Sequence, residues 1–305
     1  MNADAATLTS AGALLRRAGP LDTTVMLARR ELWEHRSLWL APLVVEALLA
    51  LCLLIGQIST DIPVHVLTLQ QRMAIFTIVQ WALPMPVFLV AAIVVGFYLL
   101  DCLYTERKDR SILFWKSMPV SDELTVGSKL LVATVLVPLG ALLLTTVGGL
   151  LFDAVLAWRI PGALSWSTYE WLRTEVVLLL TVTLAVLWYA PIGAALLLLS
   201  AWARRSPVLW ATLVAVMAPL VERIGLGTHY IWSFEQYRTN GVWHKLWLGH
   251  ENVFGNFQNL RPVGTALELF NIRAAFTDVD LWLGVIAAVA MAYAAARVRR
   301  YRDDT

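Results

Sequence analysis

Apolar positions along this chain are gathered into long blocks instead of alternating with polar positions at short intervals. Most blocks approach or exceed the roughly 20 residues with which a helix crosses ~30 Å of hydrocarbon. The blocks are Leu38–Ile58, Ile75–Leu100, Leu130–Trp158, Val176–Trp202, Pro207–Val221 and Leu281–Val298. Backbone groups in lipid must pair within their own segment, and uninterrupted blocks suit helices, not the alternating strands of a membrane barrel. The pattern therefore predicts an all-α polytopic membrane protein with six transmembrane helices.

The fifth block leaves two interpretations open. It is shorter than the others, and Pro219 and Glu222 stand at its end. A segment of this kind either crosses the membrane at a tilt or breaks and continues as a helix that does not span.

Composition narrows the class further. Of 305 residues, 59% are apolar and 15% are charged, and the mean hydropathy is +0.66, which is far from the values of soluble domains. A net charge of +2 without a basic run argues against binding to nucleic acid.

Cys52 and Cys102 would lie at different depths, so no structural disulfide is expected. Residues 1–10 lack the pattern of a cleavable signal, so we expect the first span to direct insertion.

Lys and Arg residues are shared unequally between the two sides that six spans create. The N-terminal tail, the second and fourth loops and the C-terminal tail carry 16 of the 24 Lys and Arg residues. Cytoplasmic loops are enriched in Lys and Arg, so both termini are predicted to be cytoplasmic. On this interpretation residues 1–37 form a cytoplasmic tail with an interfacial helix, and residues 38–305 form the transmembrane domain.

The segment before the first span has the pattern of an amphipathic helix. Apolar residues recur at helical spacing, and charged residues occupy its flanks and back. The apolar set is Leu21, Val25, Ala28, Leu32 and Trp39, and the interfacial set of interest is Arg29, Arg30, Glu31, Trp33 and Arg36. Such a helix lies in the cytoplasmic interface, either as a simple anchor or as a mechanical element.

The cytoplasmic loop at residues 101–129 contains three different pieces. Residues 106–110 carry charges of both signs and are expected in water, whereas the apolar cluster at 112–115 is too short to cross a membrane. Pro119 ends that cluster, and Ser121 is expected to cap a new helix. A short helix with exposed aromatic residues suits either a protein docking site or a surface-lying helix in the lipid headgroups.

The segment at residues 222–280 is expected to be a small outer helical segment between the fifth and sixth spans. It is rich in aromatic residues, which argues against a disordered linker. Thr265 and Glu268 have the spacing of a capping box, and Asp278 or Asp280 is a cap candidate before the last span. A lid and a support for a gate are both compatible with this segment.

Motifs for chemistry are missing from the chain. There is no phosphate-binding loop, no Gly-x-Ser-x-Gly elbow and no His-Glu-x-x-His helix, so we expect neither catalysis nor a cofactor bound by this chain itself. His229, His244, His250 and Glu251 share the outer segment, but their spacing matches no standard metal site.

Ionisable and polar residues inside the spans are stronger candidates for a functional role, because inserting each of them into lipid costs free energy. Glu46 lies within the first span, Gln80 within the second and Asp153 within the third. They are candidates for a translocation path, or for hydrogen bonds that hold helices together.

The loop after the second span resembles the first cytoplasmic loop of ABC-2 type permeases, which are the membrane subunits of bacterial ATP-binding-cassette exporters. The resemblance is carried by Tyr104-Thr-Glu-Arg-Lys-Asp-Arg-Ser-Ile-Leu-Phe-Trp-Lys-Ser-Met-Pro-Val-Ser121, followed by Ser128-Lys129-Leu130. The stretch Arg29-Arg30-Glu31-Leu32-Trp33-Glu34-His35-Arg36 is similar to the interfacial helix of that family.

The resemblance implies a permease that moves an unidentified substrate across the bacterial inner membrane, with ATP and Mg²⁺ on a separate cytoplasmic ATPase. It also implies a second permease copy, as a homodimer or a heterodimer, in contact with membrane lipid. The coupling helix that would meet the ATPase corresponds to Ile112, Leu113, Phe114, Trp115 and Pro119, and the charged stretch before it to Glu106, Arg107, Asp109 and Arg110.

Other functions remain open at this point. One is a permease of a metal or sulfur maturation system for an extracytoplasmic enzyme. An intramembrane enzyme and an ion-driven secondary transporter belong to different classes. Glu46 and Asp153 at different depths count against the enzyme, and Pro pairs that do not align between halves count against the secondary transporter.

Overall fold

The computed structural model describes residues 20–56, 80–112, 120–159, 168–246 and 272–301, and every regular element in these ranges is a helix. Within these ranges six helices are long and apolar enough to cross a membrane, the number that the apolar blocks predicted. They are Ser37–Ile55, Gln80–Lys108, Asp122–Arg159, Trp171–Trp202, Pro207–Gly225 and Val279–Tyr301. The chain is therefore a multi-pass helical membrane protein.

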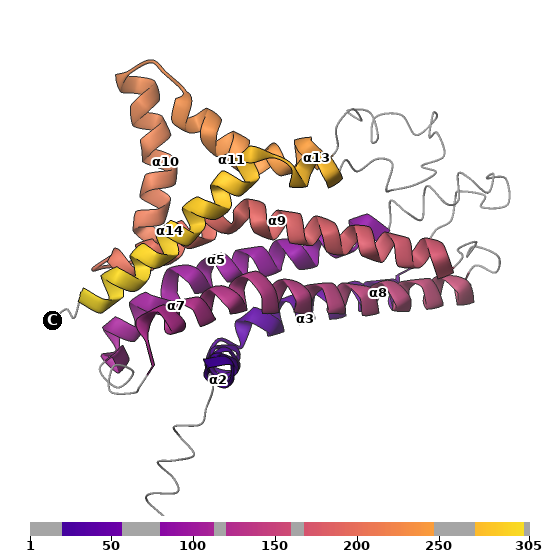
Figure 1. Cartoon of the computed structure of the whole chain (residues 1–305). Coiled ribbons are helices and arrows are strands. Elements are labelled where there is room, and N and C mark those ends of the chain that lie inside the picture. The colour runs from indigo at the N-terminus through magenta and orange to yellow at the C-terminus, as the bar shows by residue number, and fades with distance from the viewer. Residues whose placement is uncertain (1–19, 57–79, 113–119, 160–167, 247–271, 302–305) are drawn as a thin grey trace, which may run out of the picture.

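Most of the long helices form one bundle. It contains α3 (Ser37–Ile55), α5 (Pro84–Lys108), α8 (Val137–Arg159), α9 (Thr168–Trp202) and α14 (Val279–Tyr301). Helix α9 packs against α14 and α5, and α3 packs against α5 and α8. Figure 1 shows these helices running alongside one another, with α2 (Pro20–Glu34) crossing near one end of the bundle.

Several helices extend further than the apolar pattern predicted: α9 begins at Thr168, α10 covers Pro207–Gly225, and α14 covers Val279–Tyr301. The second span continues beyond Leu100 to Lys108, and the third begins at Asp122, ahead of Leu130. The third is built from α7 (Asp122–Leu131), a π-helical turn η1 (Val132–Leu136) and α8. The extra turns carry charged residues that pair with one another, so the helices do not end where the apolar blocks end.

The N-terminus of α7 confirms the predicted cap. Ser121 has an extended backbone, and its hydroxyl accepts a hydrogen bond from the amide of Leu124 at 3.1 Å. Asp122 and Glu123 occupy the first turn, where negative charge is favourable. At the start of α14, the Asp278 carboxylate accepts a hydrogen bond from the Asp280 amide at 3.0 Å.

The fifth span is one continuous helix, α10 (Pro207–Gly225), and Pro219 does not interrupt it. Figure 1 shows α10 leaning away from the bundle, while α11 (Tyr230–Leu246) returns toward α9 and the short α13 (Ile272–Phe276). Helix α10 therefore exposes most of its apolar side chains. The capping box of Thr265 and Glu268 lies outside the described residues.

Buried apolar residues form two clusters. The larger one joins α2, α3, α5, α7, α8, α9 and α14, with Leu38 and Val87 almost fully buried. The second centres on Trp188 of α9 and contains Val242 of α11 and Leu281 of α14. The larger cluster adjoins the end of the bundle where α5 finishes and α7 begins.

Candidate functional site

Four charged side chains from four different helices are buried at this end of the bundle. Glu31 of α2 and Lys129 of α7 are each 1% exposed, Arg299 of α14 is 4% exposed and Glu106 of α5 is 6% exposed. With Asp122 at the start of α7 they form the charged cluster. Charged residues are almost never buried unless they are paired, so their placement requires the contacts described next.

Lys129 lies at the centre of the charged cluster. Its Nζ is 2.7 Å from Oε1 of Glu31 and 3.0 Å from Oε1 of Glu106. Arg299 continues the chain of contacts, since its Nη2 is 3.0 Å from Oε2 of Glu106 and its Nη1 donates to Asp122. The contacts therefore run without a break from α2 through α7 and α5 to α14.

Glu31 has further partners on α5 and at the end of α2. The Tyr98 hydroxyl donates to Oε2 of Glu31 at 2.9 Å, and Nε2 of His35 is 3.8 Å from the same oxygen. The His35 ring also meets Tyr98 edge to face. Burial lowers the pKa of His35, and the nearby Glu31 carboxylate only partly offsets that effect. The imidazole is therefore held in its neutral form more strongly than in water.

Charges in the cluster almost balance. Glu31, Glu106 and Asp122 supply three carboxylates against the cations of Lys129 and Arg299. Removing one partner from such an arrangement leaves a buried charge uncompensated, which costs about 3–5 kcal/mol. The helices α2, α5, α7 and α14 must therefore keep the relative positions in which these buried charges remain paired.

Arg107 connects the same end of α5 to α9. Its Nη2 donates to the carbonyl oxygens of Ser200 at 2.6 Å and Ala203 at 2.8 Å, at the C-terminal end of α9. A cation here also suits the negative end of the α9 dipole. Five helices are thus joined by polar contacts around the two ends of one loop.

The loop between α5 and α7 is held at both ends. Glu106 and Arg107 anchor the end of α5, and Asp122 anchors the start of α7. Residues 106–110 were expected in water. Lys108, Asp109 and Arg110 are exposed, but Glu106 is buried and pairs with Lys129 and Arg299, so the expectation is wrong for Glu106. Arg110 adopts a positive φ of 57° directly after α5 ends.

The proposed coupling helix lies mostly outside the described residues. Ile112 is described and is 7% exposed, whereas Leu113, Phe114, Trp115 and Pro119 are not described. The prediction that these residues meet a partner therefore stays a prediction.

The interfacial set is divided between two surfaces of α2. Arg29 and Trp33 are exposed, and Arg30 pairs with Glu34 at 2.7 Å. Glu31 faces inward to the charged cluster, and Arg36 lies beyond the end of α2, directly before α3. Helix α2 is thus packed against α7 and η1 by its inner face.

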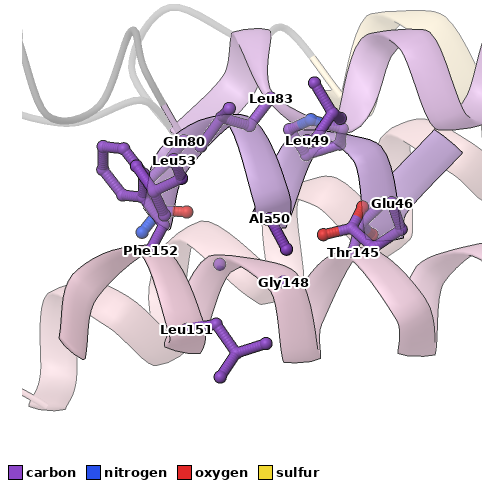
Figure 2. Close-up of a pocket in the computed structure, with 12 residues that line it drawn as sticks. Glu46, Leu49, Ala50, Leu53, Gln80, Leu83, Thr145, Gly148, Leu151 and Phe152 are labelled. Carbon is purple, nitrogen blue, oxygen red and sulfur yellow. The ribbon is translucent and has the colours of Figure 1, made fainter. Parts of the chain in front are cut away.

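The three polar residues of the spans lie near one another. Gln80 donates its amide to both carboxylate oxygens of Asp153, at 3.0 and 3.1 Å. Glu46 and Gln80 line one small cavity of about 30 Å³ together with Thr145, as Figure 2 shows. A methyl group at Gly148 would overlap the Glu46 carboxylate, so this glycine makes room for it.

The size of this cavity limits its chemistry. A volume of about 30 Å³ is enough for a water molecule but not for a substrate of ordinary size. Gln80 and Asp153 serve as a hydrogen-bonded contact between α8 and the start of the second span. The role of Glu46, Gln80 and Asp153 in a translocation path remains a prediction.

On the far side of the molecule, α11 is tied to α9, α10 and α14. The Glu222 carboxylate accepts backbone hydrogen bonds from Tyr230 and Ile231, both at 2.7 Å, at the start of α11. Arg238 lies 4.7 Å from the ring centre of Trp188, and burial lowers the pKa of this arginine. These contacts make α11 part of the folded body. Among the described residues no group of three or more His, Cys, Asp or Glu could hold a metal ion.

The charged cluster was missed as a unit by sequence reasoning. Lys129 entered the prediction through the charge asymmetry and the loop resemblance, and Arg299 through the charge asymmetry alone. The available signal was that Glu106, Lys129 and Arg299 stand at or close to the ends of apolar blocks. Opposite charges at such positions favour a buried pair.

Comparisons with known proteins give no match: no family model matches the chain, and neither does a curated protein or a solved structure.

Proposed function

We propose that this chain is the permease subunit of an ABC-2 type transporter, which moves an unidentified substrate across the bacterial inner membrane with ATP hydrolysed by a separate subunit. The observation that supports the proposal is the charged cluster. It fixes both ends of the loop at residues 109–121 to α2 and α14, and Arg107 adds α9.

This arrangement suits a loop that transmits force. A partner pressing on the loop would move α5 and α7 together, because both helices contribute to the same set of buried ion pairs. Since breaking the pairs is costly, the displacement passes to α2 and α14 as a shift of packed helices. Differential contacts with ATP-bound and ATP-free partners would then favour different arrangements of the spans. A second permease copy completes the path.

An ion-driven secondary transporter is the second candidate. The observation that favours it is the hydrogen bond between Gln80 and Asp153 beside the cavity that Glu46 lines. Intramembrane carboxyl groups are common in proton relays of such transporters.

The test is purification of the tagged chain from its native membrane in mild detergent or nanodiscs, followed by mass spectrometry. The proposal expects a stoichiometric partner that has a phosphate-binding loop and hydrolyses ATP. Phe114→Ala with Trp115→Ala should remove the partner while the chain still inserts. The matched control is Phe97→Ala with Trp158→Ala, because these two aromatic residues are exposed elsewhere on the chain.

Two results would contradict the proposal. One is a clean preparation without a nucleotide-binding partner, which would favour the secondary transporter. The other is a loop variant that retains the ATPase at the level of the control.

A further inference from the structure

An open groove of about 690 Å³ lies between α3, the start of α8 and the end of α2. Its volume is within the ~300–1,000 Å³ of typical ligand pockets. The walls are mostly apolar, and of the described residues that line the groove Arg36 is the charged one. The proposed function makes no use of this groove.

Two tryptophans form the wall on the side of α2 and α3. Trp33 is 65% exposed and Trp39 is 46% exposed. The Trp39 indole donates to the carbonyl oxygen of Leu32 at 3.3 Å, which holds its ring across the corner between the two helices. Tryptophan is enriched at the level of lipid headgroups, so the mouth of the groove is expected at that level.

The floor of the groove is formed by Leu136 at the end of η1 and by α8, where the small residues Gly140 and Ala141 lie between Val137 and Leu144. A methyl group added at Gly140 would meet no atom within 4 Å, and Ala141 beside it is buried. The floor begins at the last residue of η1, and π-helical turns are frequent at functional sites. The backbone of α8 is therefore accessible to a long apolar chain.

Arg36 places at the rim a cation with which no described residue pairs. Its side chain is exposed and has no hydrogen bond or ion pair with the residues that the structure describes, whereas Arg30 pairs with Glu34. The first turn of α3 contains no acidic residue. A negative group at the rim would therefore gain a partner without displacing an existing one.

We propose that the groove binds an acyl chain of a phospholipid with a net negative headgroup, whose phosphate pairs with Arg36. The apolar floor suits the acyl chain, and the exposed guanidinium suits the phosphate, which it can hold with two hydrogen bonds. A zwitterionic headgroup brings an ammonium group close to the guanidinium, so the site distinguishes lipids by charge. A bound lipid fills the space between α2, α3 and α8 and braces α2 against the bundle.

The experiment uses the full chain in nanodiscs that contain phosphatidylglycerol or phosphatidylcholine, each with a photoreactive diazirine on one acyl chain. After irradiation and digestion, mass spectrometry measures the lipid adducts on residues 132–144. We expect about five-fold more adduct from phosphatidylglycerol, since one basic residue near the surface contributes roughly that factor. Arg36→Gln should remove the difference, and Arg36→Lys should keep most of it.

A second variant tests the groove independently of the charge. Gly140→Leu fills the floor and should lower the adduct from both lipids several-fold. Gly96→Leu is the matched control, because a methyl there also meets no atom within 4 Å but lies on α5, outside the groove. Size-exclusion profiles check that each variant is folded.

Three results would overturn the proposal. Equal labelling by the two lipids in the natural chain would remove the headgroup assignment. Labelling that Gly140→Leu leaves unchanged would place the lipid elsewhere. Disulfide cross-linking of two copies through Gly140→Cys, without lipid adducts, would show that a second copy covers the groove. None of these measurements requires the ATPase, so they succeed or fail independently of the proposed function.

Discussion

Replacing Lys129 by methionine removes the cation between two buried carboxylates while keeping an unbranched side chain of similar length. In the folded chain the Lys129 Nζ is 2.7 Å from Glu31 and 3.0 Å from Glu106, and the side chain is 1% exposed. After the substitution Glu31 retains the Tyr98 hydroxyl and Glu106 retains Arg299. Each of these buried carboxylates has then lost the neighbouring positive charge of Lys129.

The expected loss of stability is about 3–5 kcal/mol, the usual cost of removing one partner from a buried ion pair. By contrast, Lys108→Met changes an exposed lysine near the same end of the bundle and should stay within about 0.5 kcal/mol. Glu31→Gln combined with Lys129→Met should recover part of the loss, because it removes one of the charges left unpaired. The two substitutions are therefore expected to be non-additive by more than about 0.5 kcal/mol.

Thermal unfolding in one detergent, followed by size-exclusion chromatography of the heated sample, compares the natural chain with Lys129→Met, Glu31→Gln, the double variant and the Lys108→Met control. Lys129→Met should melt several degrees below the natural chain, and the double variant should lie between them. The reasoning fails if Lys129→Met melts with the Lys108→Met control, or if the Glu31→Gln and Lys129→Met effects simply add.

Three further predictions use the same unfolding assay. His35 binds a proton more weakly in the folded chain than in the unfolded one, so stability should fall as pH decreases from ~6.5 toward its lowered pKa and level off below it. His35→Gln should flatten that part of the profile, and an unchanged slope would contradict the assignment. Gly148→Ala should lower the melting temperature relative to Gly140→Ala, since only the first methyl displaces the Glu46 carboxylate; equal melting would refute it. Ser121→Ala should cost about 1 kcal/mol through loss of the α7 cap, whereas Ser121→Asn should cost little, and equal losses would argue against capping.

The parts of the fold that follow from local pattern were predictable. The six spans come from uninterrupted apolar blocks, and Ser121 followed by two acidic residues marks a helix start. The sequence did not decide whether α10 continues through Pro219, which it does. A proline is tolerated in a membrane helix only when neighbouring groups satisfy the freed carbonyl, and local pattern does not reveal those neighbours.

The candidate site depends on contacts that local pattern does not contain. Glu31 and Lys129 are 98 residues apart, and Glu106 and Arg299 are 193 residues apart. The run of charges at residues 106–110 led to the expectation that Glu106 lies in water. Its buried partners Lys129 and Arg299 lie on α7 and α14, and no rule of spacing relates these helices to α5. The bonding of Gln80 to Asp153, 73 residues further on, is unpredictable for the same reason.

The order in which the cluster is assembled has a consequence for biosynthesis. Glu31, Glu106 and Asp122 leave the ribosome before Arg299, which follows Glu106 by 193 residues. At roughly 5–20 residues per second this interval is about 10–40 s. Until the last helix is inserted, Glu31 and Glu106 share the cation of Lys129, and Asp122 lacks its partner Arg299. A chain that stops short of Arg299 keeps three carboxylates against one cation at this end instead of three against two, so the finished cluster marks a protein that was translated and inserted to its final helix.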